Sequence, residues 1–399
     1  MFPKKIIHKN FMASFLGERT LAPFYEKAHN SIENKTIYNE PVKDETAIDE
    51  NLYIIEDVPD YLNLSHSKEH SHISIKKVTL YEGYLIDFTR FSGLEDYLKT
   101  HFGKSSRSKL RRYINRLELC FPITYKMYFG EISREHYDFI FNRFKQMLNR
   151  RFAQKEEYNY ELEYWDEFES LTYDLIIEKK ASLFVIYNQE EPINICMNMI
   201  YDKILFSNVS CYDIDYSAFN LGSIDMLKHI EWSFDNRMVA MDLLKGYFYY
   251  KQRWINHRYK YQYHYIYNKR NHITRVEANA KRLKKGGYFY LLNLLKRFNI
   301  HFWYRYLVKI KYRLFSKPSN SLKVHKKPSF EHGLVEPYDE NNVVDLESKQ
   351  FSFIKKAVFD FLYSNHEAFK DVKVIRLKEQ PSEFLIRGKY YSQYIGFTR

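Results

Sequence analysis

The sequence predicts a mixed α+β fold, because strand and helix patterns follow one another through its central part. Three short, largely apolar segments bounded by turn residues are predicted strands: Ser182–Tyr187, Ile193–Tyr201 and Leu205–Cys211. Two preceding segments carry apolar residues at helical spacing and are predicted helices: Arg134–Phe152 and Trp165–Lys179. A helix that begins at Asn220 and a strand at Met238–Leu243 follow. Strand, helix and strand in this order predict a crossover between parallel strands.

The segment before this central part has weaker patterns. Ile73–Leu80 and Gly83–Phe88 are predicted to be two strands joined near Glu82 and Gly83. Leu94–Leu117 is predicted to be one helix. The chain therefore has mixed secondary structure on both sides of residue 100.

After Asn268 the composition becomes basic. Between Tyr265 and Phe330 there are 17 Lys or Arg and one acid, whereas the whole chain has 62 Lys or Arg and 50 Asp or Glu. The net charge of +12 therefore resides in this part of the chain. The patterns predict a basic helix, His272–Lys285, that ends at Gly286–Gly287, and a second helix with an apolar stripe, Tyr288–Phe315. A linker, Ser316–Pro337, follows. The last predicted elements are a helix, Phe351–Tyr363, and two strands, Val372–Leu377 and Glu383–Gly388.

Cysteine usage and hydropathy predict a cytoplasmic protein. Cys120, Cys196 and Cys211 form neither a metal-binding spacing nor an even disulfide framework, which favours a reducing compartment. The basic N-terminus lacks the apolar core of a signal peptide, and no apolar run approaches the ~20 residues that span a bilayer. The basic segment predicts in addition a peripheral contact with an anionic membrane, at its inner face.

Several residues have the chemistry of a binding or catalytic site. The helix start at Asn220, Gly222 and Ser223 presents backbone amides to an anion such as a pyrophosphate. Asp242 lies at a predicted strand end, where it could accept a proton or cap a turn. The acids Asp213 and Asp215 follow the strand Leu205–Cys211 and have the same two interpretations.

Several basic and histidine residues also have both a functional and a structural interpretation. Three arginines on the predicted helix, Arg107, Arg111 and Arg112, could grip a phosphate or form a solvated face. Arg150 is assigned to the dipole at a helix end. Three histidines in a polar loop, His66, His70 and His72, are spaced like metal ligands but lack an acidic or Cys partner, so no metal is predicted.

The order of motifs between Phe102 and Trp254 resembles a known family. These motifs are Ser105-Ser-Arg-Ser-Lys-Leu-Arg-Arg112, the turn Tyr212-Asp-Ile-Asp-Tyr216, Asn220-Leu-Gly-Ser223, the strand that contains Asp242, and Gly246-x-x-x-Tyr250-Lys251-x-x-Trp254. The set is similar to GNAT-superfamily acetyltransferases of the CelD-like type, which are related to the FemAB peptidoglycan aminoacyltransferases. The resemblance implies a GNAT-like acyltransferase domain, with a degenerate GNAT-like copy before it.

The resemblance also implies domains and site roles. The expected division is a degenerate half (1–101), the acyltransferase domain (102–268), a basic aromatic segment and linker (269–337) and a small C-terminal α/β segment (338–399). Lys251 and Asp242 are the expected catalytic residues. The expected donor-binding residues are Asn220, Gly222, Ser223, Arg107, Arg111 and Arg112, and the expected acceptor-binding residues are Asp213, Asp215 and Tyr250.

The expected reaction moves an acyl group, most simply acetyl from acetyl-CoA, to an amine or hydroxyl of a cell-envelope or small-molecule acceptor. The Arg/Gln-x-x-Gly-x-Gly/Ala loop that holds acyl-CoA in GNAT enzymes is absent, and only Asn220-Leu-Gly-Ser223 stands in its place. An aminoacyl-tRNA donor, as in FemAB-like enzymes, is therefore the first alternative. A non-catalytic binder of nucleic acid or anionic membrane is the second, since basic and aromatic residues alternate after Tyr265.

Overall fold

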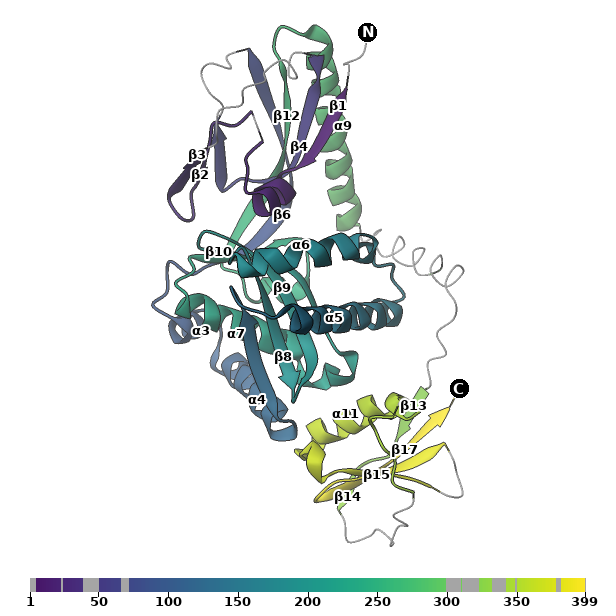
Figure 1. The fold of residues 1–399 in the computed structure, drawn as a ribbon. Coiled ribbons are helices and arrows are strands. Elements are labelled where there is room, and N and C mark those ends of the chain that lie inside the picture. The colour runs from purple at the N-terminus through teal and green to yellow at the C-terminus, as the bar shows by residue number, and fades with distance from the viewer. Residues whose placement is uncertain are drawn as a thin grey trace. The chain divides into compact units, whose positions relative to one another are not determined.

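The computed structural model describes residues 5–22, 24–38, 50–65, 72–298, 310, 323–331, 342–348, 350–377 and 382–398. The chain forms two compact units, and each combines parts that are distant in sequence. Unit 1 contains Met1–Tyr97, Met199–Asn208 and Trp232–Tyr306, and unit 2 contains Leu98–Asn198, Val209–Glu231 and Leu307–Arg399. Helices and strands are both abundant, so the predicted α+β class is confirmed (Figure 1). The four domains predicted from the sequence follow chain order and stay a prediction.

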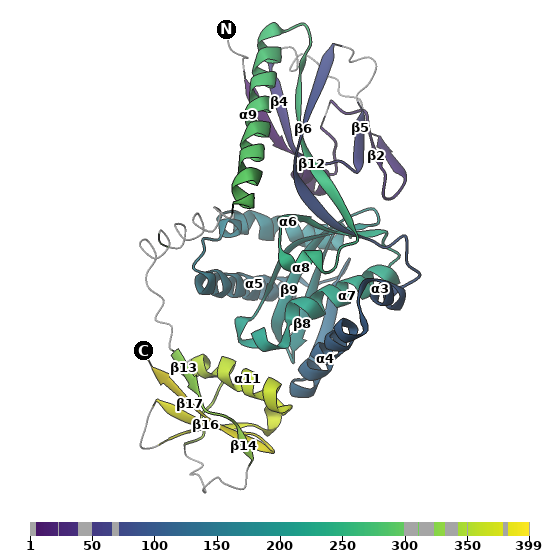
Figure 2. The same ribbon diagram turned by 180° about the vertical axis from the view of Figure 1, so that it is seen from behind.

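Unit 1 is a mixed sheet with a long helix on one face. Its strands follow the order β1, β4, β12, β6, β11 and β10, and a smaller sheet has the order β3, β2 and β5. Helix α9 packs along β6 and β12, as Figure 2 shows. The elements are β1 (Ile6–Asn10), α1 (Phe11–Ala13), the π-helix η1 (Ser14–Glu18), β2 (Lys27–Asn30), β3 (Lys35–Tyr38), β4 (Leu52–Pro59), β5 (Leu62–Ser65), β6 (Ile73–Asp87), β11 (Ala240–Lys245), α8 (Tyr249–Gln252), β12 (His257–Asn268) and α9 (His272–Arg297).

The predicted break near Gly83 is wrong, because β6 is one continuous strand of 15 residues. Gly83 pairs with Tyr259 on β12 and with Lys245 on β11. A Cβ at Gly83 would lie 2.1 Å from Cζ of the Tyr259 ring. The glycine is therefore a site of close approach within a strand and not a turn.

Gly83→Ala is expected to lower the free energy of unfolding by about 3 kcal/mol, because the new methyl group overlaps a fully enclosed ring. Urea unfolding of the full chain measures the loss. Gly17→Ala is the matched control, since a Cβ at Gly17 meets nothing within 4 Å. Equal unfolding free energies for the two variants would show that the Tyr259 ring does not depend on Gly83.

The predicted helix end at Gly286–Gly287 is also wrong, because α9 runs through both glycines to Arg297. Glycine inside a helix costs about 1 kcal/mol relative to alanine, so tertiary packing must offset it. A Cβ at Gly286 would lie 3.4 Å from Val78 Cγ2 on β6, which is ordinary van der Waals contact. The predicted helix Tyr288–Phe315 begins inside α9, and most of it after Phe298 lies outside the described residues.

Unit 2 contains the strand order β9, β8, β7 with helices around it. The predicted hairpin and the helices from Arg134 and Trp165 are confirmed. The elements in this half of the chain are α3 (Leu94–His101), α4 (Lys104–Cys120), β7 (Ile123–Tyr128), α5 (Arg134–Lys155), the 3₁₀ helix η3 (Tyr160–Tyr164), α6 (Trp165–Ile177), β8 (Ala181–Asn188), β9 (Glu191–Tyr201), β10 (Ile204–Tyr212), the 3₁₀ helix η4 (Ile214–Phe219) and α7 (Leu221–Asp235). The four elements α3, β9, β10 and α7 have residues in both units.

The single helix predicted over Leu94–Leu117 is two helices. Gly103, with ψ of 159°, is extended and separates α3 from α4. Arg107 Nη1 donates to the carbonyl oxygen of Phe102 at 2.6 Å, just past the end of α3. The break therefore supplies an acceptor that an uninterrupted helix would use internally.

The C-terminal segment shares the core of unit 2. Phe359 on α11 lies 4.6 Å from the Tyr216 ring and 5.0 Å from the Phe121 ring, measured between centroids. Buried apolar residues of both parts form one cluster. This segment contains β13 (Lys323–Lys326), β14 (Phe330–Glu331), the 3₁₀ helix η7 (Ser352–Ile354), α11 (Lys355–Asn365), the 3₁₀ helix η8 (Phe369–Asp371), β15 (Lys373–Arg376), β16 (Glu383–Arg387) and β17 (Tyr391–Thr398). The packing places α11 beside the turn that follows β10.

Candidate functional site

The crossover predicted from the sequence is present. Strands β10 and β11 are parallel, and α7 lies between them in the chain. Their pairing covers Ile204–Phe206 against Ala240–Asp242, whereas β10 continues to Tyr212. The acidic turn after Tyr212 thus follows the part of β10 that does not pair with β11.

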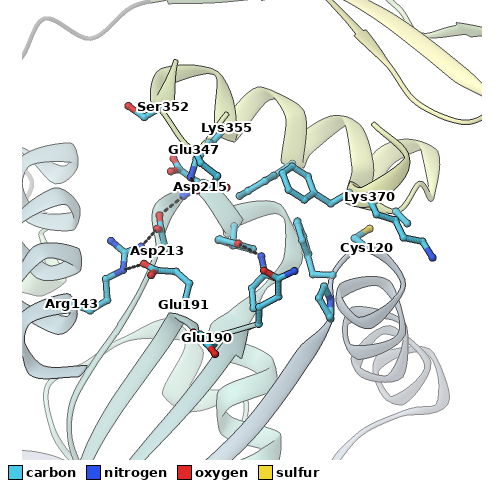
Figure 3. Close-up of a pocket in the computed structure, with 18 of the residues that line it drawn as sticks. Cys120, Arg143, Glu190, Glu191, Asp213, Asp215, Glu347, Ser352, Lys355 and Lys370 are labelled. Carbon is cyan, nitrogen blue, oxygen red and sulfur yellow. Dashed lines mark hydrogen bonds and ion pairs between the residues drawn. The ribbon is translucent and has the colours of Figure 1, made fainter. Parts of the chain in front are cut away.

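Asp213 and Asp215 are held by two arginines of α5. Arg143 Nη2 lies 2.5 Å from Asp213 Oδ2, and Arg150 contacts Asp213 Oδ1 and Asp215 Oδ2, each at 2.9 Å. Arg143 Nε also lies 2.6 Å from Glu191 Oε1. Figure 3 shows Arg143 directed at Asp213 and Glu191, with α11 across from them. The turn is therefore a rigid network of charge-assisted hydrogen bonds.

The charges within this network are unevenly compensated. Burial raises the pKa of Asp215, as does the nearby charge of Asp213, while Arg150 opposes both. The main chain contributes as well, since the amide of residue 215 donates to Asp213 Oδ1 at 3.0 Å. Arg150 therefore favours the ionised form of the Asp215 carboxyl group against the effect of burial.

The acidic turn borders a cavity of about 1540 Å³ within unit 2. Six carboxylates and four basic side chains line it, so its charge balance favours a cationic or polar ligand. The ionisable lining residues are Glu118, Glu190, Glu191, Asp213, Asp215, Glu347, Arg143, Arg150, Lys355 and Lys370. Aromatic side chains add apolar surface: Phe121, Phe139, Tyr216, Phe359 and Phe369. Ionisable groups and aromatic rings therefore line the same cavity.

Sequence reasoning missed Arg143 and misassigned Arg150. Arg150 is not a helix-end residue, because α5 continues to Lys155. The two arginines are seven positions apart and therefore share a helix face. That spacing, together with the Asp-x-Asp turn, was the available signal for this network.

A second cluster, the Asp242 cluster, lies in unit 1 and contains Asp242, Tyr61, Tyr259 and Tyr261. Asp242 is 0% exposed and accepts from Tyr61 at 3.0 Å, from Tyr259 at 2.8 Å and from the Leu244 amide at 2.7 Å. The Tyr259 and Tyr261 hydroxyls lie 2.7 Å apart. Burial raises the pKa of Asp242 to about 6, although these hydrogen bonds oppose the shift. The carboxyl group is enclosed, which favours a positioning role over direct contact with an acceptor.

Lys251 is buried as well, with 5% of its surface exposed. Its ammonium donates to the carbonyl oxygens of Leu243 at 2.6 Å and Lys245 at 2.8 Å. Burial lowers the pKa of Lys251 to about 8, and the charge of Asp242 opposes that shift. Among the described residues these two carbonyls are its hydrogen-bond partners, and the same ammonium lies 5.3 Å from the centroid of the Phe248 ring.

The remaining predicted site residues are more exposed. Gly222 is exposed at the start of α7, after Asn220 with φ of 58°, and both belong to unit 2. Arg111 and Arg112 are exposed on α4, whereas Arg107 binds the carbonyl of Phe102. Ser223 is half-buried beside Gly222, and Tyr250 is half-exposed beside Lys251.

One group among the described residues has metal-ligand character: Cys196, Asp225 and His229, all buried. His229 Nδ1 lies 2.8 Å from the carbonyl oxygen of residue 225, and its Nε2 lies 3.0 Å from Asn198 Nδ2. Both ring nitrogens are therefore engaged, and the group fits a buried hydrogen-bond network better than a metal site. His66 and His70 lie outside the described residues.

Comparison with known proteins identifies the central segment. Residues 104–252 match the family model described as the acetyltransferase (GNAT) domain. No curated protein matches the chain. Within the described part of the chain, no helix is both long and apolar enough to cross a bilayer.

Solved structures show only a distant likeness. L-PGS from Bacillus licheniformis is 11% identical with a TM-score of 0.35, covering 59% of this chain and 73% of its own. FemX is 10% identical with a TM-score of 0.39, covering 55% and 73%. A tandem GNAT protein from the clavulanic acid biosynthesis pathway is 7% identical with a TM-score of 0.28, covering 53% and 63%. Scores this low carry no argument about function. Residues 104–252 are therefore similar to the GNAT acetyltransferase domain, within a chain of mixed α+β fold.

Proposed function

We propose that the protein is an acyltransferase that moves an acyl group, most simply acetyl, from acyl-CoA to an amine or hydroxyl of a cell-envelope or small-molecule acceptor. The observation that carries the proposal is the GNAT match, which includes Arg143, Arg150, Asp213, Asp215 and Lys251. The acceptor nucleophile attacks the thioester carbonyl, a tetrahedral oxyanion forms, and the CoA thiolate leaves. The proton lost by the nucleophile passes to a base or to the thiolate.

Lys251 is the proposed catalytic residue, because its ammonium can donate to the oxyanion as negative charge develops there. Asp242 is a positioning residue in this proposal. Its negative charge supports the protonated state of Lys251, and its oxygens hold the hydroxyls of Tyr61 and Tyr259. Desolvation of both groups makes their mutual attraction stronger than it would be in water.

The helix start at Asn220, Gly222 and Ser223 is the proposed donor site, and Arg107, Arg111 and Arg112 are proposed to contact donor phosphates. Backbone amides at a helix N-terminus favour phosphate groups. The cavity beside Asp213 and Asp215 is the proposed acceptor site. A contact of Tyr250 with the acceptor stays a prediction from the sequence. The excess of carboxylates in the cavity suits an acceptor that carries an amine.

An aminoacyl-tRNA donor is the second candidate, and it is the FemAB-like variant of the same reaction. The absence of the acyl-CoA loop motif and the exposed arginines of α4 favour it. An acetyl-CoA donor corresponds to the CelD-like variant. A non-catalytic protein that binds nucleic acid or an anionic membrane is the rival from a different class.

Ser223→Glu is expected to weaken acetyl-CoA binding at least tenfold, because the new carboxylate repels phosphate at the helix start. The fold should tolerate it, since an acid in the first turn is favourable to a helix. Isothermal titration of the full chain with acetyl-CoA measures the effect. Ser170→Glu is the matched control, an exposed serine on α6.

The same titration separates the candidates. Binding of acetyl-CoA, with release of free thiol when hexosamines or diamines are added, supports the proposal. Binding of aminoacyl-tRNA but not of acetyl-CoA would show that aminoacyl-tRNA is the acyl donor. No acyl transfer with either donor leaves the non-catalytic rival as the function.

A further inference from the structure

The inner face of helix α9 packs on the sheet of unit 1. Thr274 and Ala278 are buried, and the Phe289 ring lies 5.4 Å from the Tyr81 ring. Lys285 Nζ lies 4.6 Å from the centroid of the Tyr263 ring. Figure 2 shows the helix lying along the sheet. The side that faces away from the sheet is therefore not needed to hold the helix in place.

That outer face carries an apolar stripe. Val276, Leu283 and Tyr290 are 68%, 66% and 74% exposed, and Leu294 and Phe298 continue the series. The spacings of seven, seven, four and four residues place all five side chains on one face of the helix. Exposed apolar side chains that align over more than five turns mark an interaction surface rather than scattered surface residues.

Basic side chains surround the stripe. Apart from Lys285 on the inner face, six Lys or Arg of α9 stand against one acid: Arg275, Lys281, Arg282, Lys284, Lys296 and Arg297 against Glu277. The acid is partly neutralised, because Lys281 Nζ lies 3.5 Å from its Oε1. The surface therefore combines an apolar centre with a strongly positive border.

We propose that this outer face of α9 docks on an anionic lipid bilayer, with the stripe in the interfacial region and the basic residues at the headgroups. The chemistry selects this occupant. A second copy of the chain would bring like charges together. Nucleic acid would pair with the basic residues but would leave Val276, Leu283 and Leu294 without apolar contacts. The helix would lie on the bilayer, because its charges prevent it from spanning. This inference stands independently of the proposed acyl transfer.

Co-sedimentation of the full chain with vesicles tests the surface. Binding is expected to vesicles of phosphatidylglycerol and phosphatidylcholine in equal parts, to fall strongly at high salt, and to be absent for phosphatidylcholine alone. Leu283→Gln should weaken binding about tenfold through lost apolar burial. Lys284→Gln should weaken it about fivefold through lost attraction to the headgroups.

Matched controls separate the stripe from general surface effects. Leu171→Gln removes a comparably exposed leucine on α6, and Lys27→Gln an exposed lysine on β2; neither should alter vesicle binding. Equal binding by Leu283→Gln and Leu171→Gln would overturn the proposal. So would a chain that binds single-stranded RNA but not the mixed vesicles, or a lipid-indifferent dimer that Leu283→Gln converts to a monomer.

Discussion

Lys251→Met is expected to lower acyl transfer about 100-fold or more, through a reduced kcat, because the oxyanion loses its charged donor. Methionine keeps the volume of the side chain but not its hydrogen bonds. The carbonyls of Leu243 and Lys245 lose their donor, so the variant should also lose about 2 kcal/mol of stability.

A pH profile distinguishes catalysis by Lys251 from a structural role. The pKa of Lys251 is lowered to about 8, and the proposal requires the protonated form, so wild-type kcat should fall as the pH rises through about 8. Lys251→Arg keeps the charge at all accessible pH values and should remove this alkaline fall. A Lys251→Met enzyme that is destabilised but keeps its kcat would remove Lys251 from the mechanism.

Asp242→Asn is expected to change how stability depends on pH. The folded pKa of Asp242 is raised from 3.8 to about 6, so the native state keeps a proton that the unfolded chain releases. The stability this proton contributes is fully present below pH 3.8 and is lost as the pH rises through 6. The difference corresponds to about 3 kcal/mol. The asparagine variant should lack this fall, while Tyr61 and Tyr259 keep an oxygen acceptor.

The same variant should shift the activity profile. Asp242 raises the pKa of Lys251 by its negative charge, so Asp242→Asn should move the alkaline fall of kcat to below pH 8. Urea unfolding between pH 4 and 7 and rate measurements above pH 6 supply the two readouts. Asp166→Asn, an exposed acid on α6, is the control for both. An unmoved alkaline fall would contradict the positioning role of Asp242.

The elements with strong local patterns were predictable. Helix α5 and the β8–β9 hairpin follow from short-range periodicity and turn residues, which act within a few positions of the chain. The β10–α7–β11 crossover followed from element order alone. The GNAT resemblance rested on this same ordered set of motifs, and the family match to residues 104–252 agrees with it.

The continuity of β6 and α9 through their glycines could not be predicted, because it depends on packing between segments that are distant in sequence. Gly83 lies inside β6, where a ring from β12 occupies the space that a side chain would need, and Gly286 lies inside α9, which packs along the sheet. Both glycines have the local signature of a turn or a helix end. Packing against a strand that is distant in sequence outweighs a cost of about 1 kcal/mol per glycine.

The sequence by itself determined which residues can carry charge and donate or accept protons: Asp213, Asp215, Asp242 and Lys251 were all identifiable from it. The tertiary structure alone decided their environments. Arg143 and Arg150 meet Asp213 only because α5 packs beside the end of β10, 63 to 70 positions along the chain. Lys251 and Asp242 acquire shifted pKa values only through burial. Desolvation and ion pairing depend on distances in space, and local sequence does not encode those distances.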